Sequence, residues 1–371
     1  MAVTVRLLLH TDATRLGGAE NSLRHLAGAL DPSLDVVVAG PDLDVLRHVA
    51  QDRPAACLLA YSPLAGPWDA TGLVRLRRLL RRARVDLVHL NLSWAGSSTL
   101  PSLAALTLPR TPVVAVEQLS LPTSTALGRR VKQVLSRRLA AHVAVGGRAA
   151  REAERDNGLR PDSVQVVHNG VPDTGPMPAR ARNGPPVIGT LARFDRQKGL
   201  DVLVRALSLV PDATLVLAGG GEEEQVLRDL VADLRLGDRV EILSWVPEGR
   251  LLLSTFDVFV LPSRYEGFPL SIVEAMLAGV PVVATDVGST REAVETGVTG
   301  WLVPVDDHVA LAEALEQAVS APPEVVRQAR ERALSRFTAD AMARAYEQVY
   351  AEVLKRPVGR GTPGLKPARR A

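Results

Sequence analysis

The stretch Phe256–Thr285, FDVFVLPSRYEGFPLSIVEAMLAGVPVVAT, decides the fold of this chain. It begins with an aliphatic run that leads into a polar loop, continues as a longer segment of helical length, and ends in a second aliphatic run, Val280–Ala284. Short aliphatic runs bounded by Gly, Pro or Asp are typical of strands buried in a parallel sheet. The stretch therefore predicts a strand, a crossover helix and a second, parallel strand.

The same alternation continues through both halves of the chain. Helices are expected at Ala19–Leu30, Leu73–Arg84 and Arg129–Ala140. Strands are expected at Thr4–His10, Asp35–Ala39, Leu87–Leu90, Val113–Val116 and His142–Val145 in the first half, and at Val187–Leu191, Thr214–Ala218, Val240–Leu243, Val258–Leu261 and Val280–Ala284 in the second. Strands that alternate with helices predict an α/β fold in which each half forms its own doubly wound sheet.

The chain has 371 residues, which is more than one hydrophobic core usually organises. Residues 171–186, VPDTGPMPARARNGPP, contain five prolines, which prevent regular backbone hydrogen bonding and predict an exposed connector. We therefore expect one domain at 1–170 and a second at 187–354. The last helical stretch, Ala339–Leu354, either packs on the second sheet or crosses back to the first domain. Residues 355–371, rich in Pro, Gly and Arg, predict a disordered basic tail.

The composition, 46% apolar and 23% charged, is that of an ordinary globular protein. The single cysteine, Cys57, excludes an internal disulfide and is expected to be a small buried apolar residue. Met1–His10 carries Arg6 within its apolar run, so we interpret it as a first strand rather than a signal peptide. No stretch reaches the roughly 20 uninterrupted apolar residues that cross a bilayer. We expect a cytoplasmic protein that is at most peripheral at the inner membrane face.

Two carboxylates mark the loop and helix between the two strands quoted first. Glu266 lies in the loop and Glu274 lies in the helix, so the two can contact different parts of one extended ligand. Carboxylates accept hydrogen bonds from vicinal hydroxyl groups, and the amides of Gly267, Phe268 and Leu270 at the helix start can hold a diphosphate. The alternative is that Glu266 caps the helix and Glu274 is solvated.

Two cations follow the expected strand Val187–Leu191. Arg193 and Lys198 stand five positions apart, before a helix that opens near Gly199. Arginine offers a planar fork to one phosphate, whereas lysine presents a compact charge to another. Because no cluster of metal ligands is apparent in the sequence, we expect these side chains to supply the charge that a divalent ion supplies elsewhere. A solvated surface pair is the alternative.

Gly17 and Gly18 lie between the first strand and the first helix, in RLGGAENSLRHLAGAL. Such a pair suits a phosphate or substrate loop, and it equally suits a tight turn. The spaced glycines of a dinucleotide-binding fingerprint are missing, which argues against a dehydrogenase.

Two predicted helices of the first half are strongly basic, LVRLRRLLRRAR at 73–84 and GRRVKQVLSRR at 128–138. Their interleaved leucines and valines give each an apolar stripe. Such a helix either rests on an anionic membrane or covers the sheet with its leucines and exposes its arginines to water. Nucleic acid is not expected as a partner, because no base-reading motif accompanies the arginines.

Up to about Leu354, the chain resembles the retaining GT-B glycosyltransferases of family 4, which have two Rossmann-like domains facing across a cleft. The resemblance rests on the two glutamates separated by seven residues (Glu266, Glu274), the Arg193 and Lys198 pair, HNGVP at His168–Pro172 and DVGSTREAV at Asp286–Val294.

The resemblance implies a reaction that retains the anomeric configuration and a donor that is a UDP- or GDP-linked sugar, with no metal or other cofactor. It places Glu274 on the ribose, Glu266 on the sugar hydroxyls, and Arg193 and Lys198 on the diphosphate. The base would lie near Ser244–Val246, beside Val246 and with Trp245 flanking it. The acceptor, a sugar, a lipid-linked molecule or another small molecule, would bind mainly to the first domain.

The chain departs from the family pattern after the strand Val113–Val116. Many family members place a histidine there, near the anomeric carbon, whereas this chain reads VEQLS, with Glu117 and Gln118 at that position. Either side chain can form a hydrogen bond with a sugar hydroxyl. The departure leaves two other functions open, a nucleotide-sugar-binding subunit without turnover and a sugar-nucleotide isomerase of the same architecture.

Overall fold

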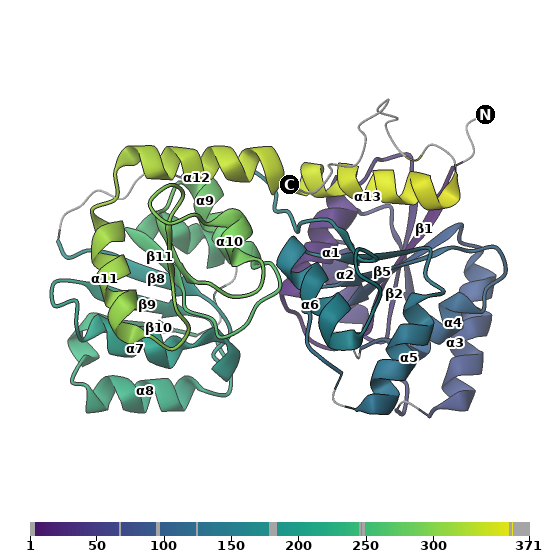
Figure 1. Cartoon of the computed structure of the whole chain (residues 1–371), viewed down its shortest axis with the longest axis horizontal. Coiled ribbons are helices and arrows are strands. Elements are labelled where there is room, and N and C mark those ends of the chain that lie inside the picture. Colours follow the sequence, from purple (N-terminus) through teal and green to yellow (C-terminus); the bar gives the residue numbers. More distant parts are fainter. Residues whose placement is uncertain are drawn as a thin grey trace. The chain divides into compact units, whose positions relative to one another are not determined.

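The computed structural model describes residues 4–66, 68–93, 97–123, 125–177, 184–244, 246, 249–355 and 358. The chain divides into two compact units. Unit 1 comprises Met1–Val145, Ala150–Val167 and Ala339–Ala371, and unit 2 comprises Gly146–Ala149 and His168–Thr338. Both units alternate strands with helices, as Figure 1 shows.

Unit 1 contains a seven-stranded parallel sheet in the order β3-β2-β1-β4-β5-β6-β7. Its strands are β1 Arg6–Thr11, β2 Asp35–Gly40, β3 Cys57–Ala60, β4 Leu87–Leu92, β5 Val113–Glu117, β6 Ala141–Ala144 and β7 Gln165–Val166. Its helices are α1 Gly18–Ala29, α2 Leu43–Val49, α3 Ala70–Ala83, α4 Thr99–Leu106, α5 Ala126–Ser136 and α13 Ala339–Leu354, together with most of α6 Gly147–Asn157. The strand order reverses at β1, where β4 follows on the other side, and parallel sheets bind ligands at such a point.

Helices α3 and α4 are held on the sheet of unit 1 by aliphatic side chains. Leu76 and Leu80 of α3 share a buried cluster with Ala104 of α4 and with the strand residues Leu8 and Val88. Their spacing of four places both leucines on one face of α3 and leaves the arginines of that helix on the other faces. The basic helix is therefore amphipathic, as its sequence predicts.

Unit 2 contains a six-stranded parallel sheet in the order β10-β9-β8-β11-β12-β13. Its strands are β8 Val187–Leu191, β9 Thr214–Ala218, β10 Val240–Leu243, β11 Val258–Leu261, β12 Val282–Thr285 and β13 Trp301–Val303. Its helices are α7 Leu200–Leu207, α8 Glu224–Asp233, α9 Leu270–Ala278, α10 Thr290–Ala293, α11 His308–Val319 and α12 Pro323–Arg336, with three short 3₁₀ turns, η1 Arg196–Lys198, η2 Gly237–Arg239 and η3 Gly249–Thr255.

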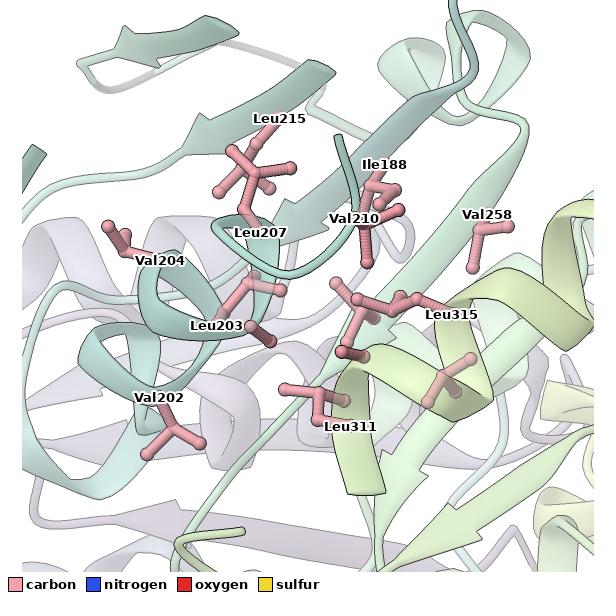
Figure 2. Close-up of a cluster of buried hydrophobic side chains, with 14 of the residues drawn as sticks. Ile188, Val202, Leu203, Val204, Leu207, Val210, Leu215, Val258, Leu311 and Leu315 are labelled. Atoms are coloured by element: carbon pink, nitrogen blue, oxygen red, sulfur yellow. The ribbon is translucent and has the colours of Figure 1, made fainter. Parts of the chain in front are cut away.

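A single aliphatic cluster fixes α7 and α11 against the sheet of unit 2. Figure 2 shows Leu203 and Leu207 of α7 beside Leu311 and Leu315 of α11, with the strand residue Ile188 in the same cluster. All five side chains have at most 1% of their surface exposed, and burying one leucine contributes roughly 2 kcal/mol. This packing fixes the start of α7, and hence the end of the loop that precedes it.

The predicted fold class is confirmed, since two parallel sheets are each flanked by helices. The structure places the four strands β8, β9, β10 and β11 at the predicted bounds. It adds three strands that were not predicted, β3, β7 and β13. The predicted start of β12 at Val280 is two residues early, because Pro281 has no amide hydrogen to give to a sheet.

The boundaries of the second domain need correction at both ends. Val171 is buried, and its amide donates to the Phe337 carbonyl at 3.0 Å, so the first part of the predicted connector 171–186 is bound within unit 2. Residues 178–183 lie outside the described residues. The predicted range 187–354 runs too far, because α13 belongs to unit 1 and unit 2 ends at Thr338.

Three polar contacts hold α13 in unit 1. His89 Nδ1 and the Tyr350 hydroxyl lie 2.7 Å apart, and the Asp31 amide donates to Glu347 Oε1 at 2.8 Å. Ser22 Oγ donates to the sulfur of Met342 at 3.8 Å. Periodicity left open whether the last helix packs on the second sheet or returns to the first domain. The structure shows that it returns to the first domain.

The structure also bears on the predictions for Cys57 and for the C-terminal tail. Cys57 is exposed, because it lies on the edge strand β3 rather than in the core, so the prediction of a buried cysteine is wrong. Of the predicted tail 355–371, only Lys355 and Val358 are among the described residues. Within the part of the chain that the structure describes, none of the helices combines the length and the apolar character that a membrane crossing requires.

Candidate functional site

The candidate site in unit 2 lies at the carboxyl edge of its sheet. Four loops meet the ends of neighbouring parallel strands there: 192–199 after β8, 219–223 after β9, 262–269 after β11 and 286–289 after β12. Because all strands run in the same direction, their carboxyl ends share one edge, and side chains from distant segments come together there.

Lys198 and Glu266 are brought together at this edge. Lys198 Nζ lies 2.5 Å from Glu266 Oε1, and the Ser263 hydroxyl donates to the same oxygen at 2.7 Å. The two charged side chains are only 16% and 9% exposed, so water screens their attraction weakly. The Lys198 ammonium group has further N–H groups to donate, and the Glu266 carboxylate has a second oxygen that can accept hydrogen bonds.

Two glycines make this close approach of the loops sterically feasible. Gly199 has a φ of 62°, and a Cβ there would lie 2.2 Å from the Pro262 carbonyl oxygen. Gly288 has a φ of 50°, and a Cβ there would lie 1.9 Å from the carbonyl oxygen of Glu266. A larger residue at either position would push the loop after β11 away, together with the Glu266 side chain.

Arg193 lies at the exposed rim of the same edge. Its guanidinium contacts Asp195 Oδ2 at 3.0 Å and Gln197 Oε1 at 3.1 Å, both on its own loop. The side chain is 58% exposed, so a ligand can reach it. Lys198 is thus paired directly with Glu266, whereas Arg193 is held by residues of its own loop.

Glu274 lies one turn into α9, the helix that begins directly after the Glu266 loop. Its side chain is half-buried. Burial raises the pKa of the Glu274 carboxyl, and the positive charge of Arg250 partly offsets the rise. This carboxyl is therefore more easily protonated than an exposed glutamate, and it gains from a ligand that donates hydrogen bonds to it.

The loop before α9 is held by its carbonyl groups. The Ser289 amide donates to the Gly267 carbonyl at 2.8 Å, and Asn169 Nδ2 donates to the Phe268 carbonyl at 3.4 Å. No side chain of the described residues caps the start of α9, which begins at Leu270. The Phe268 ring is buried, and the binding of a diphosphate by the amides of Gly267, Phe268 and Leu270 stays a prediction.

A loop of three glycines, AGGGE at 218–222, also lies at this edge and was not predicted as part of the site. Gly219 has a φ of 152°, and a Cβ there would lie 1.8 Å from the Ala192 carbonyl oxygen. Gly221 has a φ of 159°, and a Cβ there would lie 2.3 Å from the Phe194 carbonyl oxygen. The loops after β8 and β9 therefore touch backbone to backbone. Three glycines in a row after a predicted strand are the signal that could have found them.

The predicted base position beside β10 is only partly described. Trp245 lies outside the described residues, and Val246 is half-buried. The Gly219 amide donates to the Leu243 carbonyl at 3.0 Å, which ties the end of β10 to the triple-glycine loop. The predictions for Trp245 and Val246 stay predictions.

In unit 1 the glycine pair lies at the start of α1. Gly17 is the capping residue, with an extended φ of −153°, and Gly18 is the first helical residue. A Cβ at Gly18 would meet nothing within 4 Å, so packing does not require glycine there. Burial raises the pKa of the neighbouring Glu20 carboxyl, although hydrogen bonds from its own amide, from Thr11 and from the Gly17 backbone oppose this. The Gly17 amide is thus already engaged by Glu20.

The prediction that Glu117 contacts a sugar is wrong in this structure. The Glu117 side chain is fully buried, with Oε1 lying 2.5 Å from Lys132 Nζ and 2.7 Å from His142 Nε2. Burial by itself raises the pKa of this carboxyl, but Lys132 and His142 outweigh burial and lower the pKa to about 2. Glu117 is a structural ion-pair partner. Gln118 lies beside it at the end of β5, where its Nε2 donates to Asn91 Oδ1 of β4 at 2.8 Å.

Two family models match this chain along most of its length. The model described as "Glycosyltransferase Family 4" matches residues 16–174, and the model described as "Glycosyl transferases group 1" matches residues 177–336.

Curated relatives match over shorter stretches. The lipopolysaccharide core biosynthesis glycosyltransferase LpsE of Rhizobium meliloti is 32% identical over 169 residues, which cover 45% of this chain and 50% of that protein. The putative colanic acid biosynthesis glycosyltransferase WcaL of Escherichia coli is 35% identical over 168 residues, covering 42% of this chain and 41% of that protein. The chain thus spans half or less of the length of these relatives.

Solved structures match nearly the whole chain. Anabaena HepE in complex with UDP has a TM-score of 0.79 at 22% identity, covering 94% of this chain and 100% of its own. A glycosyltransferase from Rickettsia africae has a TM-score of 0.81 at 18% identity, covering 95% and 99%. At these identities the likeness concerns the fold, which is the expected pair of Rossmann-like domains.

Proposed function

This chain belongs to the family 4 glycosyltransferases of the GT-B fold, and we propose that it transfers a sugar from a nucleotide diphosphate-sugar to an acceptor hydroxyl with retention of the anomeric configuration. The observation that carries the proposal is the Lys198–Glu266 pair, in which a cation and a carboxylate from two loops meet at the sheet edge. The names of the relatives support sugar transfer, and the UDP bound to HepE supports the choice of donor.

Each group has a defined task in the proposed reaction. Glu266 accepts hydrogen bonds from hydroxyls of the transferred sugar, and Glu274 accepts them from the ribose. Lys198 and Arg193 neutralise the charge that develops on the diphosphate, together with the amides at the start of α9. As the bond from the anomeric carbon to the phosphate oxygen breaks, the acceptor oxygen forms its bond on the same face, and the departing phosphate takes the acceptor proton. No protein nucleophile is required.

A donor panel tests the proposal. The protein is mixed with UDP- and GDP-linked sugars, with and without candidate acceptors, and the released nucleotide is measured. Acceptor-dependent release supports transfer, and NMR of the product then shows whether the configuration is retained. Binding without release would point to a subunit without turnover, and interconversion of the donor without an acceptor would point to an isomerase; either outcome contradicts the proposal.

Transfer is expected to proceed without a divalent metal. We expect Lys198 and Arg193 to supply the positive charge that a divalent ion supplies in other sugar-transfer enzymes. Addition of EDTA should therefore leave the rate of nucleotide release within about twofold, a change that corresponds to less than about 0.5 kcal/mol in the barrier. Loss of activity in EDTA that added Mg²⁺ or Mn²⁺ restores would contradict the metal-independent mechanism.

We further propose that unit 1 rests on the cytoplasmic face of an anionic membrane through its basic helices, α3 and α5. Leu127 and Val134, seven positions apart on α5, are 57% and 56% exposed, and Trp68 just before α3 is 83% exposed. Arginines surround the exposed apolar residues of α5: Arg129, Arg130, Arg137 and Arg138. A lipid-linked acceptor would be reached from such a position.

Replacing the four exposed arginines Arg129, Arg130, Arg137 and Arg138, in α5 and directly after it, by glutamine is expected to weaken binding to anionic vesicles by well over tenfold, because each basic residue near such a surface contributes about 1 kcal/mol. Cosedimentation at low and high salt measures the change. The matched control replaces four exposed arginines of unit 2, Arg205, Arg228, Arg235 and Arg327. Equal losses of vesicle binding in both variants, or vesicle binding that does not depend on the salt concentration, would contradict the proposed membrane contact.

A further inference from the structure

The Glu292 carboxylate of α10 is the centre of a polar cluster behind the Glu266 loop. Its Oε2 accepts from His168 Nε2 at 2.7 Å and from the Gly147 amide at 3.1 Å, and its Oε1 accepts from the Arg148 amide at 3.0 Å. The side chains of His168 and Glu292 are 18% and 22% exposed. Each partner of this carboxylate presents an N–H group, so both of its oxygens act only as acceptors.

The cluster joins segments that are far apart in sequence. His168 opens the second stretch of unit 2, and Gly147 and Arg148 belong to the four residues that form its first stretch. At the start of α6, the Ala149 amide donates to Ser289 Oγ at 3.2 Å. The segment 289–292 therefore caps three successive amides of α6, which is what a strong N-terminal cap does.

The same segment supports the loop that carries Glu266. The Ser289 amide donates to the Gly267 carbonyl at 2.8 Å, and Gly288 lies against the Glu266 carbonyl. On the other side, the ring of His168 packs edge-on against the buried ring of Phe268, with centroids 5.2 Å apart. Movement of Glu292 or His168 would therefore reach the Glu266 loop through its backbone and through Phe268.

We propose that Glu292 and His168 are positioning residues for the Glu266 loop, and that they hold it in the geometry that transfer requires. The inference rests on the proposed function for its kinetic consequence but not for its structural one. Burial by itself raises the pKa of the Glu292 carboxyl. The hydrogen bonds from His168 and from the two amides outweigh burial and lower the pKa to about 2. The acceptor at the centre of the cluster is therefore a carboxylate at neutral pH.

Glu292→Gln is the sharpest variant, because it keeps the shape and turns one acceptor into an NH₂ group that faces an N–H donor. We expect kcat to fall roughly 10- to 100-fold, since small misplacements of a reacting group cost that much. The Kd for free UDP should change less than about threefold, because UDP lacks the transferred sugar that Glu266 is proposed to hold. In a Glu266→Ala background, Glu292→Gln should have little further effect on kcat.

Asp307→Asn is the matched control, because Asp307 is also a capping carboxylate of unit 2 and accepts from the amides of Val309 and Ala310. Because asparagine caps a helix about as well as aspartate, it should lower Tm only slightly and leave kcat unchanged. His168→Gln is the second variant, since it leaves the α6 amides capped, keeps an N–H donor for Glu292, and removes the ring that packs on Phe268 and Phe337.

Amide hydrogen exchange of the 262–269 loop separates this inference from the proposed function, because it needs no turnover. Faster exchange of that loop in Glu292→Gln and His168→Gln, but not in Asp307→Asn, is the expected result even if no donor is found. Unchanged loop exchange, wild-type kcat in both variants, or an equal loss of kcat in the Glu266→Ala background would overturn the positioning role.

Discussion

Lys198→Met is expected to reduce kcat for nucleotide-sugar transfer by roughly 100- to 1,000-fold, the loss typical of removing one group that stabilises charge in a transition state. Two effects combine. The proposed neutralisation of the departing diphosphate is lost, and Glu266, only 9% exposed, keeps its negative charge with Ser263 as its remaining partner. That uncompensated charge would repel the diphosphate. Steady-state nucleotide release with the best donor and acceptor measures the change.

The control for Lys198→Met is Arg228→Met, which removes a cation from an exposed helical ion pair with Glu224 in the same unit. Such a pair contributes at most about 0.5 kcal/mol to stability, and its loss should leave kcat unaffected. Lys198→Arg should restore part of the rate, since it returns the charge with different geometry. Transfer by Lys198→Met at the wild-type rate would exclude Lys198 from the reaction.

The local fold was predictable where the chain has strong aliphatic runs. The strands β8 to β11 are short, mostly aliphatic runs of four or five residues, and runs of that length favour burial in a parallel sheet. By contrast, β3, β7 and β13 are short strands of two to four residues, and all three lie at sheet edges, so their pattern does not differ from that of a loop. These segments are strands because they pair with a neighbouring strand, and the periodicity of a single segment does not indicate such pairing.

The path of the last helix was not predictable for a related reason. An apolar stripe on α13 shows that the helix is covered, but not by which sheet. The deciding contacts are made with His89 and Asp31, which are 261 and 316 positions from their partners. A single sequence contains no signal for pairs at that distance.

The candidate site was predictable to the extent that chain topology determines it. Lys198 and Glu266 both follow parallel strands, so they share an edge and meet. The same topological rule gave a wrong role for Glu117. Its position at the end of β5 suggested a contact with a sugar, but the rule does not indicate whether a side chain is buried. Lys132, one of the basic residues of the helix predicted at 128–138, is likewise buried at 7% exposure, which the sequence pattern did not indicate.

The buried cluster around Glu117 leads to the second large effect, which concerns stability. Lys132→Met is expected to lower the free energy of unfolding at neutral pH by about 3–5 kcal/mol, because it leaves a fully buried carboxylate without its ammonium partner. Urea unfolding measures the loss. Arg130→Met, at an exposed position of the same helix, is the control and should change stability by less than about 0.5 kcal/mol.

The pH dependence of unfolding provides the decisive comparison for Lys132→Met. The pKa of the Glu117 carboxyl is lowered from 4.5 to about 2, so its contribution to stability is complete above pH 4.5 and is lost as the pH falls towards 2. Without Lys132 the folded-state pKa rises, because burial then acts with only His142 to oppose it, and the loss should begin at higher pH. Adding Glu117→Gln to Lys132→Met removes the buried charge and should recover part of the stability. If Lys132→Met unfolds like the wild type across this range, the pair contributes nothing to folding, since a buried carboxylate that loses its partner must either remain charged at a cost or take up a proton.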